Sequence, residues 1–279
     1  HLRAHKKQMW SIVLTIGIYD SGLGGLSVWR ELRRYTSTRL LYYGDTSHVP
    51  YGEKTPTQLE GYFWNIVGFF LDQGCEAVVV ACNTSSALVL PKVAGKVSVP
   101  VFGIIESAVG ATLEVSAGRI GVLATRGTVE SGAYQAAFQQ ARPDARVFMR
   151  SAPRLVPLVE QGEVHSDVTR QALREYVDPL LAEGIDTLLL GCTHYPFVQG
   201  LLEEIVGPDV RIVNPAPALA LEVAQLFPNL AKRQGPEDKT NETQFWVSGD
   251  PEAFKTTAEL LLQEQLPAVR FHHMAGETT

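Results

Sequence analysis

The sequence predicts an α/β protein with two pseudo-symmetric α/β domains, mainly parallel sheets, and a functional site in the cleft between the domains. Three observations support this prediction. Short apolar runs alternate with segments of helical periodicity along the 279 residues. A similar series of elements begins twice, near Gly17 and near Gly121. In each half a cysteine, Cys82 or Cys192, directly follows a buried apolar run.

The first half reads as a regular alternation of strands and helices. After its first strand the chain turns through DSGLGG at 20–25, and after its second it passes through GDTSHVPYG at 44–52. The next helix has a clear start, because Thr55 is a good N-cap, Pro56 suits the first helical position and Gln58 completes a capping box. The expected strands are 12–19, 39–43, 77–81 and 99–104, with helices from Leu26, after Thr55 and after Ser85.

The second half repeats this course. The expected strands are 119–124, 146–149, 186–190 and 210–213, with helices at 131–140 and 168–181. The segment NPAP at 214–217 is typical of a crossing between domains. A helix at 218–227, a polar loop at 232–242, a strand at 243–248 and a last helix follow.

These patterns predict the domain boundaries. The first domain comprises 12–104 together with 215–279, the second domain comprises 105–214, and residues 1–11 are a leader or a cloning remnant.

Composition limits the function classes. The chain is 45% hydrophobic and 19% charged, with a net charge of −6 and a pI near 5.7, so no nucleic-acid or membrane partner is expected. No apolar run reaches the length of about 18 residues that a membrane-spanning helix needs. Three cysteines without close pairing argue against a disulfide framework and for a reducing compartment, the cytoplasm.

Cys82 and Cys192 are expected at the carboxyl ends of strands, where open α/β sheets bind their ligands. Both precede polar residues at a helix start, a position that lowers the pKa of a thiol. Cys75 lies at the opposite end of the sheet and is expected to be structural. The polar residues beside the two cysteines can cap helices and can also hold a carboxylate ligand through hydroxyl, amide and backbone N–H groups.

Four kinds of chemistry would use these two thiols. Disulfide exchange normally uses closely spaced cysteines, and metal binding by Cys82, Cys192 and His194 lacks a compact ligand pair, so no metal site is expected. A cysteine hydrolase with His194 as base leaves Cys82 unexplained. Inversion at carbon needs an acid and a base on opposite faces of the substrate, which two similar halves supply. The glycine-rich turn at 22–25 does not complete a dinucleotide-binding motif.

Four motifs in order and at suitable spacing, DSGLGG at 20–25, GDTSHVPYG at 44–52, ACNTS at 81–85 and GCTHYP at 191–196, resemble the signature segments of the glutamate racemase family. The resemblance runs from about residue 16 to 254. It implies a cofactor-independent isomerase that interconverts L- and D-glutamate by a two-base thiol mechanism and supplies D-glutamate for peptidoglycan synthesis. It also implies a cytoplasmic enzyme and a homodimer. A racemase of another acidic substrate, such as aspartate, and a thiol-based metal- or ligand-binding protein stay open as alternatives.

The resemblance also assigns roles residue by residue. Cys82 matches the thiol that acts on the D-enantiomer and Cys192 the thiol that acts on the L-enantiomer. Asp20 matches the aspartate beside the first thiol and His194 the histidine beside the second. Asp45 and Glu160 match acidic positions with supporting catalytic roles. The positions that match substrate contacts are Asp20, Ser21, Tyr51, Gly52, Asn83, Thr84, Thr193 and His194.

Overall fold

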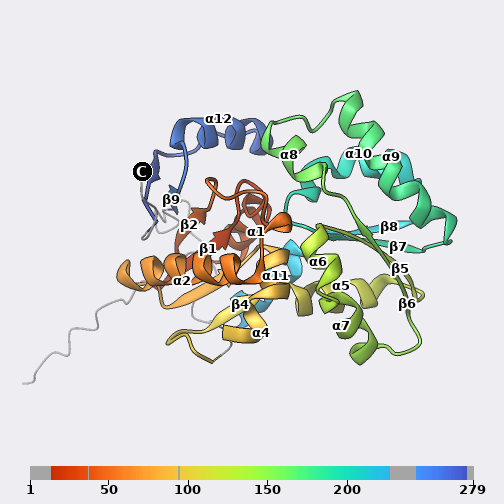
Figure 1. The fold of residues 1–279 in the computed structure, drawn as a ribbon, viewed down its shortest axis with the longest axis horizontal. Helices are drawn as coiled ribbons and strands as arrows, with labels where there is room; N and C mark the ends of the chain where they lie inside the picture. Colours follow the sequence, from red (N-terminus) through yellow and green to blue (C-terminus); the bar gives the residue numbers. More distant parts are fainter. Residues whose placement is uncertain (1–13, 37, 94, 227–242, 275–279) are drawn as a thin grey trace, which may run out of the picture.

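The computed structural model describes residues 14–36, 38–93, 95–226 and 243–274, which form two parallel sheets with helices packed around them (Figure 1). The first sheet has the strand order β10-β9-β2-β1-β3-β4 and the second has the order β6-β5-β7-β8. The first sheet consists of β1 (Thr15–Asp20), β2 (Arg39–Gly44), β3 (Ala77–Val80), β4 (Val101–Gly103), β9 (Thr243–Val247) and β10 (Val269–Phe271). The second consists of β5 (Arg119–Ala124), β6 (Arg146–Ser151), β7 (Thr187–Gly191) and β8 (Arg211–Val213).

The helices follow the strands along the chain. Those before β5 are α1 (Leu26–Tyr35), the 3-10 helix η1 (Tyr51–Glu53), α2 (Pro56–Asp72), α3 (Asn83–Leu88), α4 (Leu90–Val93) and α5 (Ile105–Val115). Those after β5 are α6 (Arg126–Glu130), α7 (Ala133–Ala141), α8 (Leu155–Glu160), α9 (Asp167–Ala182), the 3-10 helix η2 (Tyr195–Val198), α10 (Gln199–Val206), α11 (Ala216–Leu226) and α12 (Pro251–Leu262). Among the described residues no helix is both long and apolar enough to cross a membrane.

The internal repeat is a repeat of topology. In the first sheet the order β2-β1-β3-β4 corresponds strand for strand to β6-β5-β7-β8 in the second. The central strands β1 and β5 are buried along almost their whole length, as the continuous apolar patterns predict. Both carry a glycine against which a side chain packs closely. A Cβ built on Gly17 would lie 2.6 Å from the Phe70 ring, and one on Gly121 would lie 2.7 Å from Ile185 Cδ1.

The chain crosses between the sheets twice. It leaves β4 through Ile104 into α5, which packs on α7, β7 and β8 of the second sheet. It returns after β8 through α11, which packs on α1 and β4. In Figure 1 the C-terminal elements α12 and β9 accordingly lie with the N-terminal strands β1 and β2, apart from β5 to β8. The division into 12–104 with 215–279 and 105–214 is our proposal for the domain boundaries.

Most predicted elements are present within a few residues of their expected positions. The capping box of α2 is confirmed, since the Thr55 hydroxyl accepts from the Gln58 backbone and the Gln58 side chain accepts from the Thr55 backbone. The helix expected at 131–140 is α7, and the short helix α6 precedes it, separated from α7 by Gly132 with a left-handed φ of 70°. The start of the first predicted strand, 12–13, and the loop at 232–242 lie outside the described residues.

Candidate active site at the interface of the two domains

The two cysteines lie where the two halves of the protein meet. Cys82 is the N-cap of α3 and Cys192 follows β7, and each is only 4% exposed. Two hydrogen bonds join their surroundings. The Thr193 hydroxyl donates to Asp20 Oδ2 at 3.0 Å, and the Ser27 hydroxyl donates to the Thr193 carbonyl at 3.0 Å. The carboxyl ends of β1 and β7 therefore face each other, as the sequence predicts.

Cys82 is held by the first turn of its own helix. The backbone and the hydroxyl of Ser85 hydrogen-bond to Cys82, and both contacts lower the pKa of the thiol. Ser85 is fixed in turn by the Tyr19 hydroxyl, at 3.1 Å between the two oxygens. Burial and then the charge of Asp20 act in the opposite direction and raise the pKa of Cys82 to about 12. The charge of Cys192 contributes in the same direction.

Asp20 is fully buried at the end of β1. Its Oδ1 accepts a hydrogen bond from the Gly22 backbone at 3.1 Å, and its Oδ2 accepts one from Thr193. Burial raises the pKa of Asp20 to about 6, although His194 and these hydrogen bonds oppose the shift. Near neutral pH the carboxylate is therefore ionised and stands ready to accept from a cation.

Cys192 is the first member of a chain of three side chains, of which Cys192 and His194 are buried and Glu160 is partly buried. Its Sγ lies 3.7 Å from His194 Nδ1, and His194 Nε2 lies 2.6 Å from Glu160 Oε1. Burial alone lowers the pKa of His194, but the contacts with Cys192 and Glu160 outweigh it, so the pKa is well above its ordinary value. Glu160 Oε1 also accepts from the Leu23 backbone at 2.8 Å. The imidazole is thus held protonated beside the thiol.

The glycines of the DSGLGG turn leave room for these groups. A Cβ on Gly22 would collide with Glu160 Oε1, and one on Gly24 would collide with the His194 ring and the Thr193 hydroxyl. Ser21 is buried in the same turn. Close packing of the two halves therefore accounts for this glycine-rich segment.

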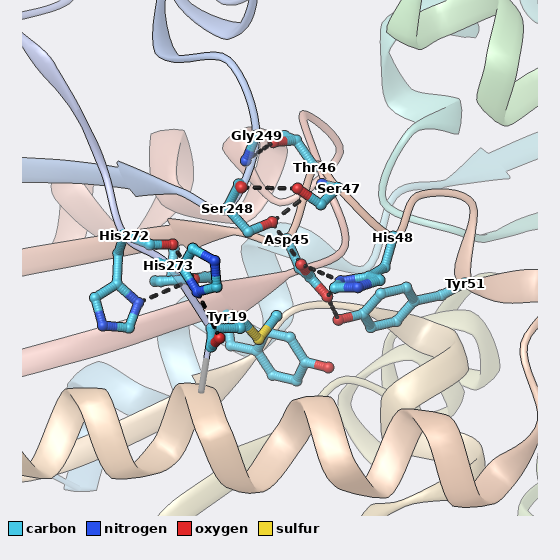
Figure 2. Close-up of polar contacts among 12 residues, drawn as sticks. Tyr19, Asp45, Thr46, Ser47, His48, Tyr51, Ser248, Gly249, His272 and His273 are labelled. Atoms are coloured by element: carbon cyan, nitrogen blue, oxygen red, sulfur yellow. Dashed lines mark hydrogen bonds and ion pairs between the residues drawn. The ribbon is translucent and has the colours of Figure 1, made fainter. Parts of the chain in front are cut away.

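Asp45 lies at the end of β2 and is also fully buried, and Figure 2 shows the groups around it. His48 Nδ1 lies 2.7 Å from Oδ1, the Ser248 hydroxyl donates to Oδ1 at 2.6 Å, and the Tyr51 hydroxyl donates to Oδ2. Both carboxylate oxygens therefore contact protein groups, and they tie β2 and the end of β9 to the turn that carries Tyr51 and Gly52.

That turn contacts the second half directly. A Cβ on Gly52 would lie 2.7 Å from Thr125 Cβ, so η1 packs on the start of α6. Thr84 belongs to the same contact, because its hydroxyl lies 2.9 Å from Thr125 Oγ1 and 3.3 Å from Thr128 Oγ1.

Asn83, the first residue of α3, is 2% exposed. Its Oδ1 accepts a hydrogen bond from the Tyr134 hydroxyl at 2.6 Å. Within the described part of the chain, its Nδ2 has no hydrogen-bond partner. A buried amide of this kind can bind a carboxylate.

The predicted site residues lie on the facing turns of the two halves or in the loop that Asp45 holds, except Glu160, which is the last residue of α8. The three cysteines are free thiols, and Cys75 is buried at the opposite end of β3. Among the described residues no group of three or more His, Cys, Asp or Glu side chains is arranged to hold a metal ion. Sequence reasoning missed Ser27, Thr125, Tyr134 and Ser248. Ser85, inside the ACNTS motif, is among the polar residues that this motif pointed to.

Comparison with known proteins gives the family of the chain. The family model described as Asp/Glu/Hydantoin racemase matches residues 23–223. A glutamate racemase of Desulforudis audaxviator (strain MP104C) is 43% identical over 255 residues, which cover 88% of this chain and 92% of that protein.

Two solved structures have the same fold. The glutamate racemase isoform RacE1 from Bacillus anthracis has a TM-score of 0.85 at 30% identity, with 95% of this chain and 99% of that chain covered. The glutamate racemase from Francisella tularensis in complex with D-glutamate has a TM-score of 0.82 at 27% identity, with 94% and 98% covered. The chain therefore belongs to the Asp/Glu/Hydantoin racemase family, and it is an amino-acid racemase whose relatives are glutamate racemases.

Proposed function

We propose that this protein interconverts L- and D-glutamate, with Cys82 and Cys192 as the acid and the base on opposite faces of Cα. The observation that carries the proposal is the placement of two buried thiols on equivalent turns of two facing halves. Inversion at carbon needs one group that removes a proton and a second that delivers one from the other side.

The two thiols have different neighbours. Cys82, with its pKa raised by burial and by Asp20, keeps its proton near neutral pH. Beside Cys192 lies His194, whose pKa is raised and whose Nδ1 is 3.7 Å from Cys192 Sγ. In the direction from L to D, the Cys192 thiolate removes the Cα proton and the Cys82 thiol delivers its proton to the opposite face.

The reverse reaction exchanges these roles. After turnover from L to D, Cys82 is the thiolate and Cys192 carries the proton that it took from the substrate. Abstraction from D-glutamate by Cys82 then restores the first state. The Ser85 hydrogen bonds to Cys82 stabilise its thiolate during this part of the cycle.

The intermediate carbanion requires strong stabilisation, because the Cα proton is much less acidic than a thiol. Hydrogen bonds to the substrate carboxylates in a site closed to water supply it. The donors at hand are Nδ2 of Asn83, the hydroxyl of Thr84, and the backbone N–H groups of the facing turns. The Asp20 carboxylate is placed to accept from the substrate ammonium.

Glutamate is the proposed substrate because the relatives of the chain are glutamate racemases. The test is an assay of the purified protein by circular dichroism with L- and D-glutamate and with L- and D-aspartate, without added cofactor. Loss of optical activity with glutamate, at a rate at least about 100-fold above that with aspartate, is the expected result. Preferential racemisation of aspartate would assign the protein to the alternative substrate, and absence of racemisation would contradict the proposal.

The wider role follows from the same resemblance. We propose that the product D-glutamate serves peptidoglycan synthesis and that the enzyme acts in the cytoplasm as a homodimer, without a nucleic-acid or membrane partner. Depletion of the protein in its host is expected to arrest cell-wall growth, with rescue by external D-glutamate. Light scattering of the purified enzyme tests the dimer.

A further inference from the structure

Tyr134 in α7 contacts the residues next to both cysteines. It is fully buried, and its hydroxyl donates to Oδ1 of Asn83, the residue after Cys82, at 2.6 Å. Its ring lies against Gly191, the residue before Cys192, where an added Cβ would be 3.2 Å from Tyr134 Cε2. One side chain of the second half thus joins the two cysteine turns.

The hydrogen bond leaves the other end of the Asn83 amide free. Nδ2 is buried, and no described residue accepts from it. An unsatisfied buried donor loses its hydrogen bonds to water without replacement, so such groups are uncommon in folded proteins and call for a reason. A carboxylate ligand of the site supplies that reason, because it accepts hydrogen bonds from an amide NH₂ group.

Tyr134 determines which end of the amide is free. Burial raises the pKa of Tyr134 well above its ordinary value, so the hydroxyl keeps its proton and is available as a donor. With this proton directed at Oδ1, the amide presents its NH₂ group, and not its oxygen, to the ligand. An amide turned the other way would place an oxygen against a carboxylate and repel it.

We propose that Tyr134 is a positioning residue for the racemase reaction, which acts through Asn83 by holding its NH₂ group toward a carboxylate of the substrate. The inference rests on the proposed function. It also couples the two halves, because Tyr134 orients Asn83 only when α7 of the second half is packed against α3 of the first.

The test is a double-mutant cycle with Tyr134→Phe and Asn83→Ala, assayed with L- and D-glutamate. Tyr134→Phe keeps the ring and removes the hydroxyl, and kcat/KM is expected to fall about tenfold, which corresponds to about 1.4 kcal/mol. The fall must be equal in both directions because the two enantiomers have equal free energy. In the Asn83→Ala background the same substitution is expected to have almost no effect.

Tyr43→Phe is the matched control. Tyr43 is equally buried, and its hydroxyl lies 3.2 Å from His272 Nδ1. Both Phe variants are expected to unfold at similar temperatures, with activity reduced only in Tyr134→Phe.

Asn83→Asp gives a second test that leaves Tyr134 intact. The aspartate carboxylate in this variant still accepts a hydrogen bond from Tyr134 but offers no donor to the substrate carboxylate, so KM is expected to rise at least tenfold.

The outcomes separate the two proposals. A wild-type protein without glutamate racemase activity overturns the proposed function. With an active wild type, the inference about Tyr134 is overturned if Tyr134→Phe matches Tyr43→Phe, if its effect persists in the Asn83→Ala background, or if Asn83→Asp binds glutamate like the wild type.

Discussion

Cys82 and Cys192 occupy the same position in two copies of one strand arrangement. Val78 pairs with Gly17 and Leu188 pairs with Gly121, and each cysteine lies four residues after the paired strand residue. Because the register is the same, both sulfurs emerge at the carboxyl ends of equivalent strands. Two similar halves that face each other can then present one thiol to each side of a small substrate.

The first prediction concerns the three cysteines. Cys82→Ala and Cys192→Ala are each expected to lower the racemisation rate at least about 10³-fold, because each removes a general acid–base group. Cys75→Ala changes a buried thiol at the other end of β3 and is expected to retain activity within about twofold. Circular dichroism of glutamate measures all three. Near-normal turnover by either of the first two variants would contradict the mechanism.

Ser85→Ala tests the local control of Cys82. The variant removes the hydroxyl hydrogen bond that lowers the pKa of this thiol. A hydrogen bond to a charged group contributes about 1.5–3 kcal/mol, so kcat/KM is expected to fall at least about tenfold in both directions. The basic limb of the profile of kcat/KM against pH is expected to move to higher pH. The neighbouring Ser86→Ala, whose hydroxyl bonds to the Val80 carbonyl, should lower the unfolding temperature without moving this limb.

Asp20→Asn is expected to stabilise the protein while it abolishes catalysis. The pKa of Asp20 rises from 3.8 to about 6 on folding, which corresponds to about 3 kcal/mol. The folded state therefore binds more protons than the unfolded state between these pH values, and wild-type stability falls as the pH rises through this window. The gain in unfolding free energy should be largest at pH 8 and disappear near pH 4. Urea denaturation at the two pH values measures it, and an equal gain at both would contradict the assignment.

Glu160→Gln tests the chain from Glu160 through His194 to Cys192. Glu160 helps to raise the pKa of His194 in the folded protein. The ion pair between them therefore stabilises the fold fully at pH values below the pKa of histidine in the unfolded chain. This stabilisation is lost as the pH rises through the higher pKa of His194 in the folded protein. The variant is expected to lose about 10- to 100-fold in kcat/KM. Because both residues act on one thiol, the losses in Glu160→Gln and His194→Gln should not add in the double variant. Full additivity would show that Glu160 acts independently of His194.

Asp45 is predicted to act by holding the Tyr51–Gly52 turn. Its two oxygens contact His48, Tyr51 and Ser248, so Asp45→Ala removes the carboxylate that accepts from two buried hydroxyls and contacts the partly buried His48. The expected result is a loss of about 3 kcal/mol in unfolding free energy and a higher KM, with the pH dependence of kcat unchanged. A shifted pH profile would show instead that Asp45 exchanges protons in the reaction. Ser248→Ala should have the same effects to a smaller degree.

The sequence was informative where the pattern is local. Strands β5 and β7, the capping box of α2 and the two cysteine turns depend on apolar runs, helix caps and motifs that neighbouring residues carry. The three-residue strand β10, with the sequence VRF, carries too short a pattern and was missed, as was α5.

The long-range partners of the site lay beyond this kind of reasoning. Tyr134 lies on an amphipathic helix and reads as a core residue, and only the packing of the two halves brings its hydroxyl to Asn83. Ser248 reaches Asp45 because β9 returns to pair with β2, a contact between segments about 200 residues apart.

The central claim is that two different thiols remove and deliver the proton. The most direct measurement is the initial reaction of wild-type enzyme with L-glutamate in D₂O, followed by mass spectrometry of the separated enantiomers. If Cys192 removes the protium and Cys82 delivers a solvent deuteron, the first D-glutamate formed carries deuterium at Cα while the remaining L-glutamate keeps its protium. Early D-glutamate that retains the protium of its substrate would show that a single group carries the proton from one face to the other, and would contradict the account.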